Sequence, residues 1–204
     1  MKPMIELLLL DVDGVLLHCQ HDERVRTLAQ ALHVSPMKLD SALRDEGLDR
    51  AYDSGVLDTP AYLQALSRRL QVQVDEAAWI EARVAASRPQ EAVIHRLLAL
   101  PAALRFGVLT NNGPMIAAVI ARQLPALAPR LQGNILCSGT LGGRKPDPAV
   151  FARALHHLQA LPQRTLFLDD LFVNVRGARH AGLQADTVHN ARSLGRVLRR
   201  YLPD

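Results

Sequence analysis

The chain has 204 residues, which is enough for one large domain or for a core domain with a smaller inserted part. Apolar residues make up 49% of it and charged residues 22%, a composition typical of globular proteins that excludes a disordered chain. The formal net charge of +4 is modest, and the basic residues are scattered apart from the region 192–200, so we expect no nucleic-acid partner.

The N-terminal residues 1–10 are largely apolar, but Glu6 interrupts the run and Asp11 ends it. This stretch is too short for a membrane span, so we interpret it as a first core strand rather than a signal peptide and expect no membrane partner. Cys19 and Cys137 stand far apart and form no CxxC pair, which argues against a zinc site or a disulfide. Reduced thiols of this kind fit a cytoplasmic protein.

Five short and nearly all-apolar runs predict strands, at 5–11, 105–110, 134–138, 165–169 and 183–188. Strands that are apolar throughout are typical of a sheet covered on both faces. Helical patterns alternate with the last four strands, at 114–123, 148–159 and 171–181. This alternation favours right-handed crossovers, so the sequence predicts an α/β fold with a doubly wound, parallel-sheet, Rossmann-like core.

Residues 12–104 separate the first two predicted strands, far more than one crossover helix requires. Much of this stretch has the pattern of amphipathic helices, including 59–70 and 75–86, and a further helix at 90–100 leads back to the second strand. We therefore predict an inserted α-helical cap at 18–88, with the core formed by residues 1–17 and 89–204.

Two carboxylates and a glycine follow the first predicted strand, in the order Asp11-Val12-Asp13-Gly14. Residues two apart in an extended chain point to the same side, so Asp11 and Asp13 converge while Gly14 allows a sharp turn. Converging carboxylates repel each other unless a cation relieves them, and a hard divalent ion such as Mg²⁺ is the usual solution. The alternative is a solvated turn.

Polar residues also follow the other predicted strands, at the sheet edge where doubly wound folds bind ligands. Thr110 and Asn111 begin a turn before a helix, which suits a phosphate but is also a common way to leave a strand. Lys145, one of only three lysines, lies in a glycine-led loop, where it could neutralise a carboxylate and a phosphate or simply face solvent. Asp169 and Asp170 end the fourth strand and could also cap the next helix.

In this order the motifs resemble those of the haloacid dehalogenase-like hydrolase superfamily over almost the whole chain. Residues 11–15 resemble its first motif, Thr110-Asn111 its second and Lys145-Pro146 its third. Asp169-Asp170, with Asn174 and residues 177–182, resembles the fourth. The helical insertion after the first motif is similar to that of the subfamily with an α-helical cap, which includes sugar-phosphate phosphatases and the phosphatase domain of soluble epoxide hydrolases.

The resemblance implies a Mg²⁺-dependent phosphomonoester hydrolase acting on a small phosphorylated metabolite. Asp11 would be the nucleophile that forms an aspartyl-phosphate, and Asp13 would protonate the leaving alkoxide and then activate water. Mg²⁺ would be held by the Asp11 carboxylate, the Asp13 backbone carbonyl and Asp170, with Asp169 as a direct or indirect partner. The phosphoryl oxygens would be bound by Thr110, the amide of Asn111 and Lys145, which would thereby take part in catalysis.

Three alternatives remain open at this point. The dehalogenases that name the superfamily attack carbon, need no metal and typically lack an acid matching Asp13. Phosphosugar mutases carry a cap-side histidine at the position that is Glu23 in this chain. A phosphate-binding or regulatory module with little turnover would keep all the motifs. We expect a monomer or a homodimer.

Overall fold

The computed structural model describes residues 4–44 and 47–202. Its core is a parallel five-stranded sheet with the order β5-β4-β1-β6-β7. The strands are β1 (Leu7–Leu10), β4 (Arg105–Thr110), β5 (Ile135–Cys137), β6 (Thr165–Asp169) and β7 (Gln184–Thr187). The five strands predicted from the sequence are therefore present, with ends shifted by no more than two residues.

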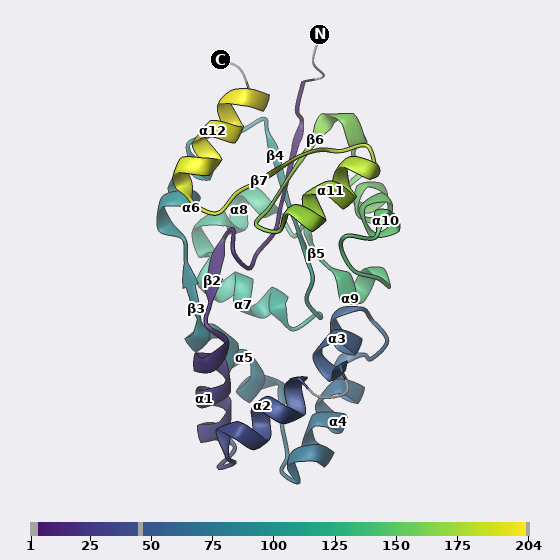
Figure 1. The fold of residues 1–204 in the computed structure, drawn as a ribbon. Helices are drawn as coiled ribbons and strands as arrows, with labels where there is room; N and C mark the ends of the chain where they lie inside the picture. Colours follow the sequence, from purple (N-terminus) through teal and green to yellow (C-terminus); the bar gives the residue numbers. More distant parts are fainter. Residues whose placement is uncertain (1–3, 45–46, 203–204) are drawn as a thin grey trace.

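Alternate residues of the central strand enter two separate apolar cores. Leu8 and Leu10 pack on one face of the sheet, whereas Leu7 and Leu9 pack on the other. The first face is covered by α6 (Glu91–Leu98), α7 (Ile116–Gln123) and α12 (Ala191–Tyr201), and the second by α10 (Pro148–Leu158) and α11 (Phe172–His180) (Figure 1). Burial on both faces explains why β1 is a continuous run of leucine, and it confirms the doubly wound core.

Shorter helical pieces complete this part of the chain: the 3₁₀ turns at Pro125–Leu127 and Pro162–Arg164, α8 (Ala128–Leu131) and α9 (Ser138–Leu141). Within residues 4–44 and 47–202, no helix is both long enough and apolar enough to cross a membrane.

After β1 the chain leaves the sheet, and the described part of residues 21–86 forms five helices, which lie beyond the carboxyl end of β1 (Figure 1). They are α1 (His21–Ala31), α2 (Pro36–Arg44), α3 (Leu48–Asp53), α4 (Thr59–Leu70) and α5 (Glu76–Ala86), and we call residues 21–86 the helical segment. Two antiparallel strands, β2 (Leu17–Cys19) and β3 (Ser87–Pro89), connect it to the core.

The limits predicted for the cap, residues 18 and 88, fall opposite each other in this strand pair, because His18 is in register with Arg88. The sequence pattern does not predict the pair itself, since three residues per strand are too few to show an alternation. The predicted core comprises residues 1–17 and 89–204. Of these, residues 1–3 and 203–204 lie outside the described part of the chain.

Tyr52 at the end of α3 connects the helical segment to the core. Its hydroxyl accepts a hydrogen bond from the backbone N–H of Met115 at 3.0 Å, and its ring stacks on Tyr62 with 4.4 Å between centroids. The ring lies so close to Gly113 that a Cβ atom at that position would overlap it. The helical segment is therefore fixed to the loop after β4 by a close-packed contact.

A methyl group at Gly113 should weaken this contact. We expect Gly113→Ala to lower the free energy of unfolding by about 1–3 kcal/mol, the usual cost of overpacking, in a urea denaturation experiment. In a Tyr52→Ala background the same substitution should cost much less. An equal cost in both backgrounds would show that the Tyr52 ring is not the obstacle.

Candidate active site

The carboxyl ends of three neighbouring strands, β4, β1 and β6, bring the predicted site residues to one place. A pocket of about 400 Å³ opens there, and the predicted residues that line it are Asp11, Asp13, Thr110, Asn111 and Asp170. Lys145 and Asp169 are buried beside Asp11. The structure therefore gathers all seven predicted site residues around one pocket, as expected for the switch region of a doubly wound sheet.

Lys145 lies between two buried carboxylates. Its Nζ is 2.9 Å from Asp11 Oδ1 and 2.7 Å from Asp169 Oδ2, and its side chain is fully buried. Burial alone would lower the pKa of Lys145, but the two negative charges outweigh it and raise the pKa, so the ammonium stays charged. Burial raises the pKa of Asp11 well above its usual value and Asp169 adds to this, against the opposing effect of Lys145. One lysine thus compensates only one of the two carboxylates.

The loop that carries Lys145 is held by the side chain of Asn111. The amide of Asn111 donates from Nδ2 to the carbonyl of Lys145 at 3.0 Å and accepts at Oδ1 from the Lys145 N–H at 2.9 Å. On its other side the loop touches α11, where a Cβ atom on Gly177 would overlap Pro146. Because the Asn111 side chain is used in this way, its backbone N–H is the group that Asn111 could offer to a ligand.

Asp169 and Asp170 have different surroundings. Asp169 is fully buried, and it accepts hydrogen bonds from Lys145 Nζ, the N–H of Leu171 at 2.8 Å and the amide of Asn174 at 3.0 Å. Asp170 is half-buried and lines the pocket, and burial together with the charge of Asp169 raises its pKa. Asp169 therefore anchors the start of α11, whereas Asp170 is available to a ligand.

The donor set fits a divalent cation. Asp11, Asp169 and Asp170 each offer a carboxylate oxygen, and these oxygens lie within 4.8 Å of one another. Hard oxygen ligands of this kind suit Mg²⁺. Lys145 supplies one positive charge among three carboxylates, so a divalent cation would offset the remaining repulsion.

Gly14 permits this grouping in two ways. Its φ of +82° is in the left-handed region, and a Cβ atom there would overlap the carboxylate of Asp170. A glycine at this position therefore lets the chain turn after β1 and leaves room for the open carboxylate.

The carboxylate of Asp13 is not part of this group, because it turns toward the helical segment. Nη2 of Arg83, on α5, is 2.8 Å from Oδ1 and 2.7 Å from Oδ2, and the amide of Asn112 donates to Oδ2 at 3.0 Å. Arg83 is only 5% exposed and also contacts the sulfur of Cys19, which lines the pocket. The backbone carbonyl is therefore what Asp13 can offer to a metal.

Sequence reasoning missed Arg83 and Asn112. The position of Asn112 directly after Thr110 and Asn111 was an available signal, and its amide also donates to the hydroxyl of Thr110 at 2.8 Å. Arg83 gives no local signal, because it is one of many arginines on amphipathic helices and reaches Asp13 across 70 residues of sequence.

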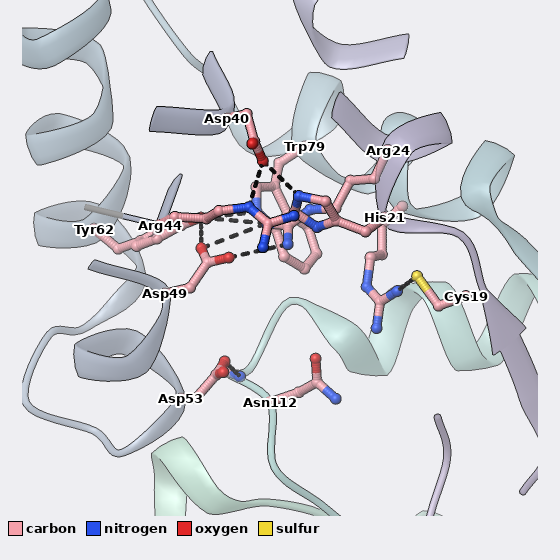
Figure 2. Close-up of polar contacts among 12 residues, drawn as sticks. Cys19, His21, Arg24, Asp40, Arg44, Asp49, Asp53, Tyr62, Trp79 and Asn112 are labelled. Carbon is pink, nitrogen blue, oxygen red and sulfur yellow. Dashed lines mark hydrogen bonds and ion pairs between the residues drawn. The ribbon is translucent and has the colours of Figure 1, made fainter. Parts of the chain in front are cut away.

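A second polar cluster ties the helices of the helical segment together (Figure 2). Arg24 Nη1 is 3.1 Å from Asp49 Oδ2, and Asp49 also accepts from the hydroxyl of Tyr62 at 2.7 Å. Trp79 donates from its indole nitrogen to the same hydroxyl at 3.2 Å, and the Arg24 guanidinium lies over the indole ring. These contacts join α1, α3, α4 and α5, which fixes the helix that carries Arg83.

Asp53 lies between this cluster and the core, next to Asn112 in Figure 2. Its carboxylate accepts from the N–H of Gly113 at 3.0 Å, and its backbone carbonyl accepts from the hydroxyl of Ser138. Burial raises the pKa of Asp53 to about 7, with a contribution from Asp49, while Arg144 and Arg24 oppose the shift. Near neutral pH this carboxyl group is therefore partly protonated.

Residues 5–182 match a family model described as haloacid dehalogenase-like hydrolase, a range that includes four of the five strands of the sheet (all but β7), the helical segment and the pocket. The chain belongs to this hydrolase family. The match confirms the resemblance to this family that the four sequence motifs indicate.

One curated relative of this haloacid dehalogenase-like hydrolase is named as a phosphatase. Phosphatase MT3486 of Mycobacterium tuberculosis (strain CDC 1551 / Oshkosh) is 38% identical over 82 residues, which are 40% of this chain. The match spans 37% of the length of that curated relative.

Solved structures share the fold at low sequence identity. A predicted haloacid dehalogenase-like hydrolase from Porphyromonas gingivalis superposes with a TM-score of 0.78 at 23% identity, over 97% of this chain and 99% of that one. A family enzyme from Bacteroides thetaiotaomicron, solved with magnesium and inorganic phosphate, gives 0.75 at 16% identity, over 90% and 93%. The L-2-haloacid dehalogenase of Xanthobacter autotrophicus gives 0.63 at 21% identity, over 96% and 82%.

Removing the charge of Asp53 should stabilise the protein at alkaline pH. Its folded pKa of about 7 lies above the value of about 3.9 for an unfolded aspartate, so this group destabilises the folded state progressively as pH rises between the two values. We expect Asp53→Asn to raise Tm at pH 8 and to raise it much less at pH 5, in thermal denaturation followed by circular dichroism. Asparagine keeps an oxygen acceptor for Gly113.

The exposed Asp22 offers a matched control, because Asp22→Asn should change Tm little at either pH. If Asp53→Asn shifts Tm equally at both values, the carboxyl group is not buried in the way described.

Proposed function

We propose that this chain is a Mg²⁺-dependent phosphomonoester hydrolase that acts on a small organic phosphate through an aspartyl-phosphate intermediate. The observation that carries the proposal is the position of Asp11, which lines a pocket and contacts a buried ammonium, and which has an oxygen within 4.8 Å of two further carboxylates that fit a divalent cation. Support comes from the phosphatase relative and from the structural neighbour solved with magnesium and inorganic phosphate.

The two oxygens of Asp11 are not equivalent. Oδ1 accepts hydrogen bonds from the N–H of Val12 at 2.7 Å and from Lys145 Nζ at 2.9 Å, whereas no hydrogen bond to Oδ2 occurs in the described part of the chain. With Oδ1 anchored, Oδ2 is the oxygen that attacks phosphorus. The new bond joins Oδ2 to phosphorus, and the bond from phosphorus to the leaving oxygen breaks.

The charge that develops on the transferred phosphoryl group needs fixed donors. Lys145 is one, and the Thr110 hydroxyl is a second, because it accepts from Asn112 and so keeps its own proton for a phosphoryl oxygen. The backbone N–H of Asn111 is the third. Mg²⁺ held by Asp11 and Asp170, with the Asp13 carbonyl and the Asp169 carboxylate nearby, would supply further positive charge to this group.

Asp13 moves the protons. In the first step it gives a proton to the leaving oxygen, and in the second it takes a proton from the water that attacks phosphorus and releases Asp11. Arg83 and Asn112 hold its carboxylate, so we propose that both are positioning residues. Since Arg83 belongs to the helical segment, we further propose that residues 18–88 act as a cap that excludes bulk water.

The nucleophile can be tested with a nearly isosteric change. Asp11→Asn should lower phosphate release from p-nitrophenyl phosphate by more than about 1,000-fold, because the amide cannot form the phosphorylated intermediate. Excess EDTA should abolish wild-type turnover, and added Mg²⁺ should restore it. The exposed Asp22 again serves as a control, since Asp22→Asn should retain activity.

Three results would contradict the proposal in different ways. Full turnover in Asp11→Asn or in EDTA would exclude the mechanism. Metal-independent halide release from a 2-haloacid would favour a dehalogenase. Tight binding of a phosphate ligand without turnover of any compound in a broad panel would favour a binding module.

The role of Arg83 can be separated from general binding by the choice of substrate. We expect Arg83→Met to lower kcat about 10- to 100-fold for glycerol 3-phosphate, because its alkoxide leaving group must be protonated. The loss should be smaller for p-nitrophenyl phosphate, because p-nitrophenolate can leave without being protonated. KM should change little, and Arg83→Lys should restore part of kcat. A rise in KM with unchanged kcat would instead place Arg83 in substrate binding.

A further inference from the structure

Arg144 is a pocket residue to which the mechanism above gives no role. It precedes Lys145 and lines the same pocket as Asp11, Asp13 and Asn112. Its Nε is buried and has no hydrogen-bond partner among the residues that the structure describes. A buried donor without a partner costs stability, so an acceptor from a ligand would be favourable at this point.

The other cations near the pocket are already paired. Lys145 contacts two carboxylates, and Arg83 is held by Asp13. Arg24 also has a buried Nε without a partner, but its terminal nitrogens bind Asp49. For Arg144, by contrast, the structure of residues 4–44 and 47–202 contains neither a side-chain hydrogen bond nor an ion pair within 4.0 Å.

The backbone of Arg144 is held in place. Its carbonyl accepts from the N–H of Asp147 at 2.9 Å, and Arg153 donates to the carbonyl of Gly142 at 3.1 Å in the same loop. The next residue, Lys145, is fixed at both its N–H and its carbonyl by Asn111. Binding of a ligand by the guanidinium would therefore order only the Arg144 side chain, which keeps the entropic cost low.

The charge of Arg144 acts toward the helical segment. It opposes the raised pKa of Asp53, on α3, whereas the charges that act most strongly on Asp11 are Lys145, Asp169 and Asp13. Arg144 therefore lies near α3 of the helical segment while it lines the pocket, so a leaving group that extends from Asp11 toward α3 would approach its guanidinium.

We propose that Arg144 binds a second anionic group, a carboxylate or a phosphate, on the leaving group of the substrate. The preferred substrates are then phosphate monoesters of alcohols that carry an acidic group, a conclusion that rests on the proposed phosphatase function. A guanidinium is suited to this role, because its parallel N–H groups match the two oxygens of such an anion.

Two probes of similar size test the proposal: 3-phosphoglycerate, which has a carboxylate, and glycerol 3-phosphate, which has a hydroxymethyl group in its place. We expect wild-type kcat/KM to favour 3-phosphoglycerate by about 10- to 100-fold, the range expected for a charge-assisted hydrogen bond. Arg144→Met should reduce this ratio to within about threefold, mainly through KM, and Arg144→Lys should give an intermediate ratio.

Arg176→Met is the matched control, because it removes the same charge from an exposed position on α11 outside the pocket and should preserve the ratio. If wild type hydrolyses p-nitrophenyl phosphate but the ratio is near one, or is unchanged in Arg144→Met, the second anion site is overturned and the proposed function stands.

If wild type hydrolyses no phosphate monoester, the proposed function fails. The second anion site is then tested by calorimetric titration with 3-phosphoglycerate in the presence of Mg²⁺. Binding that weakens at least tenfold in Arg144→Met supports it. Absent binding, or equal binding by the two proteins, overturns it.

Discussion

The buried ammonium of Lys145 is the constraint on which the rest of the site depends. A charge with no exposed surface is tolerated only when opposite charges and hydrogen bonds surround it, and here Asp11 and Asp169 provide them. The loop that carries Lys145 must then keep a fixed position relative to β4. Asn111 holds it there, because its side-chain amide donates to the carbonyl of Lys145 and accepts from its N–H. Substituting one of these residues would leave an uncompensated buried group.

The same arrangement leaves the site with too much negative charge. Asp11, Asp169 and Asp170 face one lysine, and a cluster with this charge balance would favour a divalent cation, whose charge would in turn attract the phosphoryl group of the substrate that we propose. The substrate chemistry we propose follows from this balance more than from the shape of the pocket. Arg144 is a further pocket cation, and residues 4–44 and 47–202 supply no hydrogen-bond partner for its Nε.

The helical segment contributes residues to the site. Arg83 and Asp53 come from different helices of this segment and reach Asp13 and the loop after β4, respectively. The position of the Asp13 carboxylate therefore depends on the position of α5, which carries Arg83. The polar cluster around Asp49 and Tyr62 fixes α5 through Trp79. A site shared in this way couples the geometry of Asp13, the residue that we propose transfers protons, to the packing of the helical segment.

The sequence alone predicts the parts of the molecule that depend on local patterns. Continuous leucine in β1 indicates a doubly covered sheet, and the carboxylates, threonine and lysine after successive strands converge because parallel strands end at one edge. The different environments of Asp169 and Asp170 are not predictable in this way. They depend on Asn174 one turn into α11 and on the absence of a side chain at Gly14, which is distant in sequence. The contacts of Arg83 and Asp53 depend on how the helical segment packs against the core. An amphipathic pattern predicts which face of a helix is buried, but it does not predict which element packs against that face.

The most direct test of the account is to look for the phosphorylated nucleophile. Wild-type protein mixed with Mg²⁺ and p-nitrophenyl phosphate is quenched in acid within a single turnover, and its peptides are analysed by mass spectrometry. The account predicts a phosphoryl group on Asp11 that hydroxylamine removes and that is absent from Asp11→Asn. Phosphate release at the normal rate, with no phosphorylated Asp11 at any time point, would contradict it.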